Sequence, residues 1–165
     1  MKRKEAGYTL LEMMIVLAIV GMLTTLAVTN YSEQVPHQQL RDISANLVGQ
    51  LRLARQKAIS RGTEETIFFR PDVRQYDNSF LGVQTLPSHV RFGWASNVTK
   101  APDGDKKLPD GGISFVKNNV TFSSDGSSGK KGSIYLTNSK KESVAITINF
   151  TGRIRKYLWN GHDWE

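Results

Sequence analysis

The sequence predicts an α+β protein in which a long N-terminal helix, apolar in its first half, is followed by a domain of antiparallel β-sheet. Three observations predict this fold class. The segment 8–28 is apolar apart from one acid, a one-sided helical pattern continues to Gly62, and short β-branched and aromatic segments separated by turns fill the remainder. At 165 residues the chain is long enough to form one domain with its own core.

Composition narrows the classes of function. The 39% hydrophobic and 22% charged content is that of a globular protein, which excludes wholesale disorder. The chain has no cysteine, so disulfides, thiolate zinc sites and cysteine nucleophiles are excluded. The formal net charge of +7 favours anionic partners such as nucleic acid, lipid headgroups or acidic proteins.

The N-terminal thirty residues have the pattern of a membrane segment. A basic leader, MKRKEAG, precedes sixteen residues without charge, Met13 to Val28. Counted from Tyr8, the apolar segment would form a helix of about 31 Å, enough to cross a hydrocarbon core. The basic leader is expected to stay in the cytoplasm, which places the residues after Thr29 on the far side of the membrane.

Glu12 decides between three interpretations of this segment. A cleaved secretory signal peptide and a plain membrane anchor both tolerate a carboxylate poorly, since an acid at the centre of a membrane helix costs about 2.5–3.5 kcal/mol on insertion scales. The third interpretation gives Glu12 a function. The residues Gly7-Tyr8-Thr9-Leu10-Leu11-Glu12 and the apolar run after them closely resemble the class III signal of type IV pilins and pseudopilins.

This resemblance implies the type IV pilin fold, a place in the inner membrane before assembly, and other pilin subunits as partners in a filament. It also implies that a prepilin peptidase cuts between Gly7 and Tyr8 and that the new amine of Tyr8 is methylated. Glu12 would then meet the amine of Tyr8 of a neighbouring subunit, and leaving one of the two charges alone would cost about 3–5 kcal/mol. Many relatives have a proline near Thr29, whereas this chain has none before Pro36. The expected parts are a leader 1–7, a transmembrane and filament-core helix 8–29, and a periplasmic or extracellular domain 30–165.

An amphipathic helix is predicted over about residues 37–61, because the apolar residues recur at steps of three and four and Gly62 follows. Its end, LRLARQKAISRG, resembles the same region of the FimT and GspH branch of pilin-like proteins. The bases of this helix could form a nucleic-acid stripe, but a solvated face is the favoured interpretation. The apolar stripe consists of Leu40, Ile43, Leu47, Leu51, Ala54 and Ala58, the polar residues off it include Arg41, Asp42, Gln50 and Gln56, and the candidate stripe of bases is Arg52, Arg55, Lys57 and Arg61.

Residues 65–159 are predicted to be rich in β-strands. A hairpin over 133–150 is the clearest prediction, and Ser123–Gly132 is expected to be a flexible loop. His162 and Asp163 beside Trp159 and Trp164 could suggest a general base, but no nucleophile or cleft signal accompanies them, so a flexible tail 160–165 is the favoured interpretation. The predicted strands are 66–70, 89–94, 113–116, 120–122, 133–137, 144–150 and 153–159.

Catalytic and metal-binding patterns are scarce, so we expect a protein that is not an enzyme and binds no cofactor or metal. His37, His89 and His162 have no metal-ligand spacing. Asp103, Asp105 and Asp110 could attract calcium, but the ligand pattern of a calcium loop is absent, and an ordinary turn is expected.

The basic residues of the C-terminal part carry the prediction of function. Between residues 130 and 156 seven bases stand against Glu142 alone. In the segment Gly152-Arg153-Ile154-Arg155 an extended backbone would project both guanidinium groups from one face, about 6.6–6.8 Å apart, with Ile154 toward the core. Two such groups suit successive phosphates. The seven bases are Lys130, Lys131, Lys140, Lys141, Arg153, Arg155 and Lys156.

Gly152, Arg153 and Arg155 resemble the G-R-x-R motif of the FimT minor pilins, which bind DNA during natural transformation in some Gram-negative bacteria. The resemblance implies non-sequence-specific binding of extracellular double-stranded DNA by a subunit that moves from the inner membrane, where its C-terminal domain is periplasmic, to a pilus on the cell surface. Lys156 is added from its charge, and the lysines of the two loops are further candidates. The aromatic residues Phe150, Tyr157, Trp159 and Trp164 could stack on bases, although core packing explains Phe150 and Tyr157 as well.

Two alternatives remain open. The chain could be a structural or priming minor pilin, or a GspH-like pseudopilin of a type II secretion system, without DNA binding. Independently, Arg153 and Arg155 could protect an edge strand from aggregation.

Overall fold

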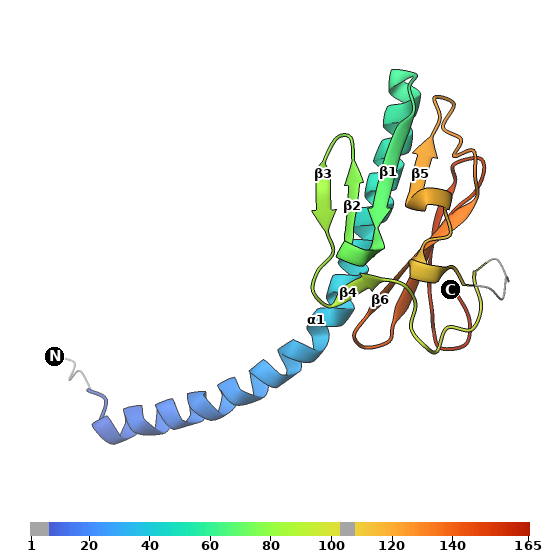
Figure 1. The fold of residues 1–165 in the computed structure, drawn as a ribbon. Coiled ribbons are helices and arrows are strands. Elements are labelled where there is room, and N and C mark those ends of the chain that lie inside the picture. Colours follow the sequence, from blue (N-terminus) through green and yellow to red (C-terminus); the bar gives the residue numbers. More distant parts are fainter. Residues whose placement is uncertain (1–6, 103–107) are drawn as a thin grey trace. The chain divides into compact units, whose positions relative to one another are not determined.

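The computed structural model describes residues 7–102 and 108–165, without the side chains of 25–33. It forms two compact units, Met1–Val35 and Pro36–Glu165. Helix α1, Leu10–Arg61, contributes to both (Figure 1). The predicted α+β class is confirmed: one long helix precedes two four-stranded antiparallel sheets.

In the N-terminal unit, Thr9 caps the start of α1. The Glu12 N–H donates to Thr9 Oγ1 at 3.2 Å, which satisfies one of the free amide groups of the first turn. The large apolar side chains from Tyr8 to Leu23 are exposed in the single chain. The segment 8–29, expected to span a membrane, ends in residues whose side chains lie outside the description. Across the described residues, no helix combines the length and the apolar character that a membrane span requires.

In the second unit, α1 continues through Pro36 and buries the stripe that the sequence predicted. Leu47, Leu51, Ala54 and Ala58 are fully buried, and Ile43 is partly buried against the same cluster. The period of three and four residues therefore identified the packed face of the helix correctly.

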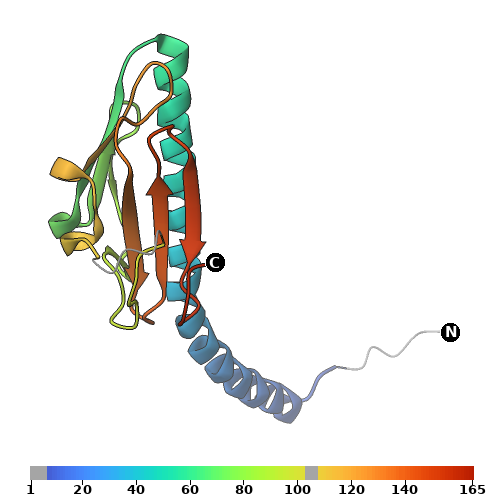
Figure 2. The ribbon, with the colours of Figure 1, turned by 90° about the vertical axis from the view of Figure 1, so that its right-hand side faces the viewer.

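Two antiparallel sheets pack along this part of α1 (Figures 1 and 2). The first has the strand order β3-β2-β1-β5 and the second the order β4-β6-β7-β8. The strands of the first sheet are β1 (Glu65–Arg70), β2 (Gln75–Asn78), β3 (Gly82–Thr85) and β5 (Asn119–Phe122), and those of the second are β4 (Val90–Phe92), β6 (Gly132–Asn138), β7 (Ser143–Ile148) and β8 (Ile154–Leu158). Short 3₁₀ helices occupy Pro71–Val73, Asp110–Gly112 and Val116–Asn118.

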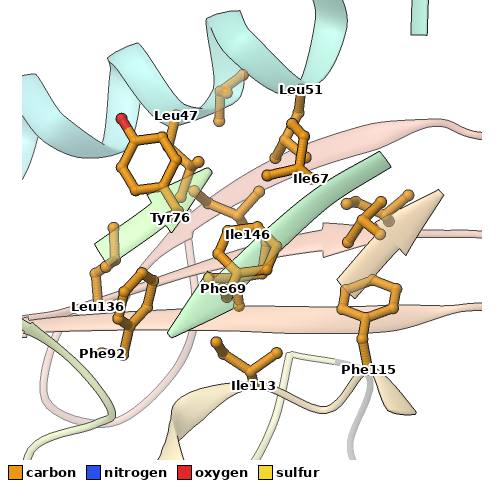
Figure 3. Packing of buried hydrophobic residues seen from close by; sticks show 14 of the residues in the cluster. Leu47, Leu51, Ile67, Phe69, Tyr76, Phe92, Ile113, Phe115, Leu136 and Ile146 are labelled. Carbon is orange, nitrogen blue, oxygen red and sulfur yellow. The ribbon is translucent and has the colours of Figure 1, made fainter. Parts of the chain in front are cut away.

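The core lies between α1 and the two sheets. Figure 3 shows Leu47 and Leu51 of the helix above Ile67, Tyr76 and Ile146 of the strands. Every residue of this cluster falls between positions 40 and 154, so the unit 36–165 contains its own complete core. Burial of each large aliphatic side chain contributes about 1.5–3 kcal/mol to that core.

The predicted hairpin over 133–150 is confirmed as β6 and β7, with Ile134 opposite Ile146. The turn between them reaches the start of the unit. Asn138 Nδ2 donates to the carbonyl of Pro36 at 3.2 Å, and His37 Nδ1 lies 2.6 Å from Glu142 Oε2. One end of this hairpin is thereby joined to the beginning of the second unit.

The strands and loops differ in part from the sequence prediction. It missed β2 and β3, whose polar residues show little alternation. It also predicted a strand over 113–116, where Ile113 forms only an isolated bridge with Ile134 and a 3₁₀ helix begins at Val116. The loop Ser123–Gly132 contains a hydrogen-bonded turn, in which the Ser123 N–H donates to the Ser127 carbonyl at 2.8 Å.

The C-terminal tail, expected to be flexible, folds back onto the second sheet. The Leu158 N–H donates to the Glu165 carbonyl at 2.7 Å, and Trp164 Nε1 donates to the carbonyl of Lys100 at 2.7 Å. The Trp164 ring packs against a small cluster that includes Tyr135 and Tyr157. Trp164, the next-to-last residue, therefore holds the tail in place.

Candidate nucleic-acid interface

The turn between β7 and β8 is held by Asn149. Its Oδ1 accepts hydrogen bonds from the Arg153 N–H at 2.8 Å and from the Thr151 hydroxyl at 2.9 Å. The Gly152 N–H donates to the Asn149 carbonyl at 3.0 Å. The backbone of Arg153 is therefore fixed at the point where β8 begins. Sequence reasoning missed Asn149, although asparagine is a common residue of such turns.

Gly152 is required for a close contact. Its φ of +73° favours glycine, and a Cβ at this position would lie 2.0 Å from the Gly126 carbonyl oxygen and 2.8 Å from Arg55 Nε. A glycine at this position lets the chain bend. The structure adds that it lets two loops touch, since Gly126 belongs to the turn before β6.

Arg55 of α1 joins both loops to the helix. Its Nε donates to the Gly126 carbonyl at 2.8 Å and its Nη2 to the Thr151 carbonyl at 3.4 Å. Its side chain is half-buried. The expectation that Arg55 belongs to a solvated face was therefore wrong, and the residue positions the turn that carries Arg153.

Ile154 packs against the core cluster, as its place between the two arginines predicted. Arg153 and Arg155 are both exposed, but they line different hollows. Arg153 lines a groove of about 530 Å³ together with Arg52. Arg155 lines a second hollow of about 480 Å³ together with Lys131, and its Nη1 donates to the hydroxyl of Tyr157 at 3.3 Å.

The strand register separates the candidate lysines. Gly132, Ile148 and Ile154 lie side by side at one end of the second sheet, so Lys130 and Lys131 are at the same end as Arg153. Lys140 and Lys141 lie in the β6–β7 turn at the other end, about 20 Å away along the strands. We therefore leave these two out of the candidate interface.

Lys156 is exposed and forms part of β8. Because side chains alternate along a strand, it leaves β8 on the face opposite to that of Arg155. The charge of Lys156 therefore lies on the other face of this edge strand.

Phe150 is 58% exposed in the β7–β8 turn, so core packing does not account for it. Trp159 is buried, and Tyr157 and Trp164 are partly buried in the second sheet's small cluster or beside it. Of the four aromatic residues that could stack on a base, Phe150 is the most available.

One acid lies near the interface. The Ser127 side chain and its N–H, which donates to Asp125 Oδ1 at 2.9 Å, lower the pKa of the Asp125 carboxyl. Asp125 is therefore ionised at neutral pH and limits the positive potential beside Gly126.

The other predicted sites give less information. Tyr8 is 81% exposed at the N-terminal side of α1, and Glu12 lies in the first turn of the helix. Within residues 7–102 and 108–165, no group of three acidic or histidine side chains converges on a common point. Asp103 and Asp105, considered for calcium, lie outside the described residues.

Comparisons with known proteins agree with this fold. Residues 2–28 match the prokaryotic N-terminal methylation motif, and residues 44–152 match the family of type II transport protein GspH. A fimbrial protein of Pseudomonas aeruginosa is 29% identical over 143 residues, covering 86% of this chain and 84% of that protein. The type II secretion system protein H of Xanthomonas campestris is 29% identical over 104 residues, 62% of each chain. Among solved structures, the type IV minor pilin FimU of P. aeruginosa shares the fold with a TM-score of 0.52 at 13% identity, covering 76% of this chain and 97% of that one.

Proposed function

Because the chain belongs to the family of type II transport protein GspH and carries the prokaryotic N-terminal methylation motif, we propose that it is a minor type IV pilin that binds double-stranded DNA. The homology makes it a pilin-like subunit that is produced as a membrane-anchored precursor. The binding of extracellular DNA during natural transformation is the part that we propose.

The observation that supports DNA binding is an arginine displayed on a fixed turn. Arg153 is exposed, its backbone is bonded to Asn149, and the turn is joined to α1 through Arg55. Arg155 and Lys131 add positive charge at the same end of the sheet. Because the backbone of Arg153 is already fixed, the binding of a phosphate oxygen requires ordering of its side chain only.

The precursor is processed and assembled as follows in this proposal. A prepilin peptidase cuts after Gly7, the amine of Tyr8 is methylated, and Glu12 pairs with that amine on a neighbouring subunit. The subunit leaves the inner membrane of a Gram-negative bacterium for a pilus, in which the unit 36–165 meets DNA outside the cell.

Binding acts on the phosphate backbone and therefore has little sequence preference. Neutralised phosphates release their counterions, so affinity falls steeply as salt rises. With three to four phosphates engaged, an increase from 50 to 200 mM salt weakens binding roughly 40- to 150-fold.

A gel-shift titration of the unit 36–165 at these two salt concentrations tests the proposal. We expect the double variant Arg153→Ala, Arg155→Ala to lose two phosphate contacts, so that the same increase in salt weakens binding only about 3- to 12-fold. The matched control, Lys140→Ala with Lys141→Ala, removes two charges at the other end of the hairpin and should leave the salt dependence unchanged. An unchanged slope in the arginine variant would exclude these arginines from DNA binding.

The same variant separates DNA binding from protection of an edge strand. β8 is the last strand of its sheet, and among the described residues the tail bonds to its outer edge only at Leu158, so the rest of that edge is open to another strand. If the arginines mainly oppose aggregation, light scattering will show self-association of the double variant. A monomeric variant with a reduced salt slope supports the binding role.

The second candidate function is a structural subunit of a pilus or of a type II secretion system. The comparisons favour it, because residues 44–152 match the family of type II transport protein GspH and a type II secretion system protein H is 29% identical over 104 residues. A deletion strain that still makes pili distinguishes the two functions. A normal transformation frequency in that strain would favour the structural subunit.

A further inference from the structure

We propose that the DNA-binding surface continues from the β7–β8 turn onto α1, where Arg52 contacts the same phosphate backbone as Arg153. This inference rests on the proposed function and extends it to a residue of a different element. Figure 2 shows the end of the β7–β8 hairpin, in red, beside the C-terminal half of α1.

The groove that both arginines line is about 530 Å³ in volume. Its helix wall includes Arg52, Gln56 and Ser60, which recur every four residues and so occupy one face of α1. Arg55 and Ile59 of α1 also line this wall. Its other wall is the start of β8, with Gly152 and Arg153. Residues separated by about one hundred positions in the sequence thus form a single hollow.

The lining of this groove suits an anion. It contains three arginines, Arg52, Arg55 and Arg153, and no carboxylate among the residues that line it. The Gln56 amide is an additional donor for phosphate oxygens, whereas the Ser60 hydroxyl already donates to the Lys57 carbonyl at 3.2 Å. Both walls of the groove therefore carry positive charge that can attract a polyanion.

Internal contacts identify Arg52 as the free cation of this helix segment. Arg55 donates to the loop carbonyls, Lys57 lies 4.0 Å from the centre of the Phe80 ring, and Arg61 Nη1 lies 3.1 Å from Glu65 Oε1. Within the described part of the chain, Arg52 is exposed and no partner is recorded for its guanidinium group. Of the four bases that could form a stripe on α1, only Arg52 is therefore available to a ligand.

The two walls are joined by Arg55, so their spacing is set before DNA arrives. Arg55 spans from α1 to the carbonyls of Gly126 and Thr151. Arg52, one helical turn earlier in α1, lies beside this joint. A fixed spacing allows both exposed arginines to bind one backbone without rearrangement of the fold.

The test compares Arg52→Gln with Arg91→Gln in the unit 36–165, with a duplex of random sequence as the probe. Arg91 is an exposed arginine of β4, the opposite edge strand of the second sheet. We expect Arg52→Gln to remove one phosphate contact, so that the loss of affinity between 50 and 200 mM salt becomes about 3.5-fold smaller. Arg91→Gln should match the wild type.

A third variant, Arg52→Lys, keeps the charge and should keep the salt slope. If Arg52→Gln and Arg91→Gln show the same slope while the Arg153 and Arg155 variant is still impaired, the extension onto α1 is wrong and the proposed function stands. If Arg52→Lys loses the slope as fully as Arg52→Gln, charge is not the cause and the inference is also overturned. If the wild type binds no duplex, both proposals fail.

Discussion

At the scale of single residues, the candidate interface depends on a contact between two glycines. The loops that contain Gly152 and Gly126 lie too close together for a side chain at position 152. A Cβ there would lie 2.0 Å from the Gly126 carbonyl oxygen. Arg55 donates its hydrogen bond to that same carbonyl. Gly152 therefore allows the two loops to pack together, whereas Arg153 and Arg155 are the residues proposed to bind DNA.

Replacement of Gly152 by alanine tests this division of roles. We expect the free energy of unfolding to fall by more than the cost of a positive φ alone, which is about 1–3 kcal/mol, because the loops must also separate. Gly129→Ala is the matched control, since Gly129 has a φ of +63° and nothing within 4 Å of its Cβ position. Urea denaturation of both variants measures the difference, and equal losses would contradict the contact.

Residue patterns predicted part of this site. The inward side chain of Ile154 between two exposed arginines follows from alternation along a strand, which is a local rule. Arg55 could not be assigned in this way. Its partners lie 71 and 96 positions away in the sequence, and only the packing of helix against loops brings them within hydrogen-bond distance.

At the scale of elements, the missed strand β2 is held to α1 by a buried polar network. Gln50 Nε2 lies 3.0 Å from the Tyr76 hydroxyl, and Asn78 Nδ2 donates to Gln50 Oε1 at 3.0 Å. Burial raises the pKa of Tyr76, although its hydrogen bond with Gln50 opposes that rise, so the phenol is protonated at neutral pH. Sequence reasoning placed Gln50 off the packed face, because a polar residue gives no sign of a buried partner.

Gln50→Ala should destabilise the unit 36–165, because the side chains of Tyr76 and Asn78 would lose a buried partner. We expect a loss of about 1–3 kcal/mol in the free energy of unfolding. Gln56→Ala, an exposed position on the same helix, should change stability by less than about 0.5 kcal/mol. Thermal or urea denaturation checks both values. An unchanged free energy of unfolding in Gln50→Ala would show that the network does not stabilise the unit.

At the scale of the whole molecule, the chain divides the tasks of a filament subunit between its two units. The methylation motif occupies residues 2–28, while the complete core and the candidate interface lie within 36–165. The apolar segment and the amphipathic helix could be recognised in the sequence because apolar runs and amphipathic periods are local signals. The order of the strands in the sheets could not be predicted from the sequence, because strands that pair in the second sheet, such as β4 and β6, are separated by about forty residues.

Because the two units are separate, we expect a substitution in the N-terminal unit to prevent assembly without affecting DNA binding. Under the proposed processing and pairing, Glu12→Ala should leave the precursor cleavable after Gly7 but exclude it from filaments, because the amine of Tyr8 would be left unpaired at a cost of about 3–5 kcal/mol. Immunoblots of sheared pili measure incorporation, and cell fractions show the processed subunit. DNA binding by the unit 36–165, which lacks Glu12, should be unaffected. Normal incorporation of the Glu12→Ala subunit would refute the pairing.

The two ends of the β6–β7 hairpin have a mechanical consequence. One end is bonded to Pro36, where the N-terminal unit joins, and β7 leads at the other end to the turn that carries Arg153. A pull on a bound duplex would therefore run along the strands and load their crosswise hydrogen bonds together, in shear. Strands loaded in shear resist force better than strands whose hydrogen bonds break one at a time, so this arrangement would keep the sheet intact while the proposed DNA ligand is under tension.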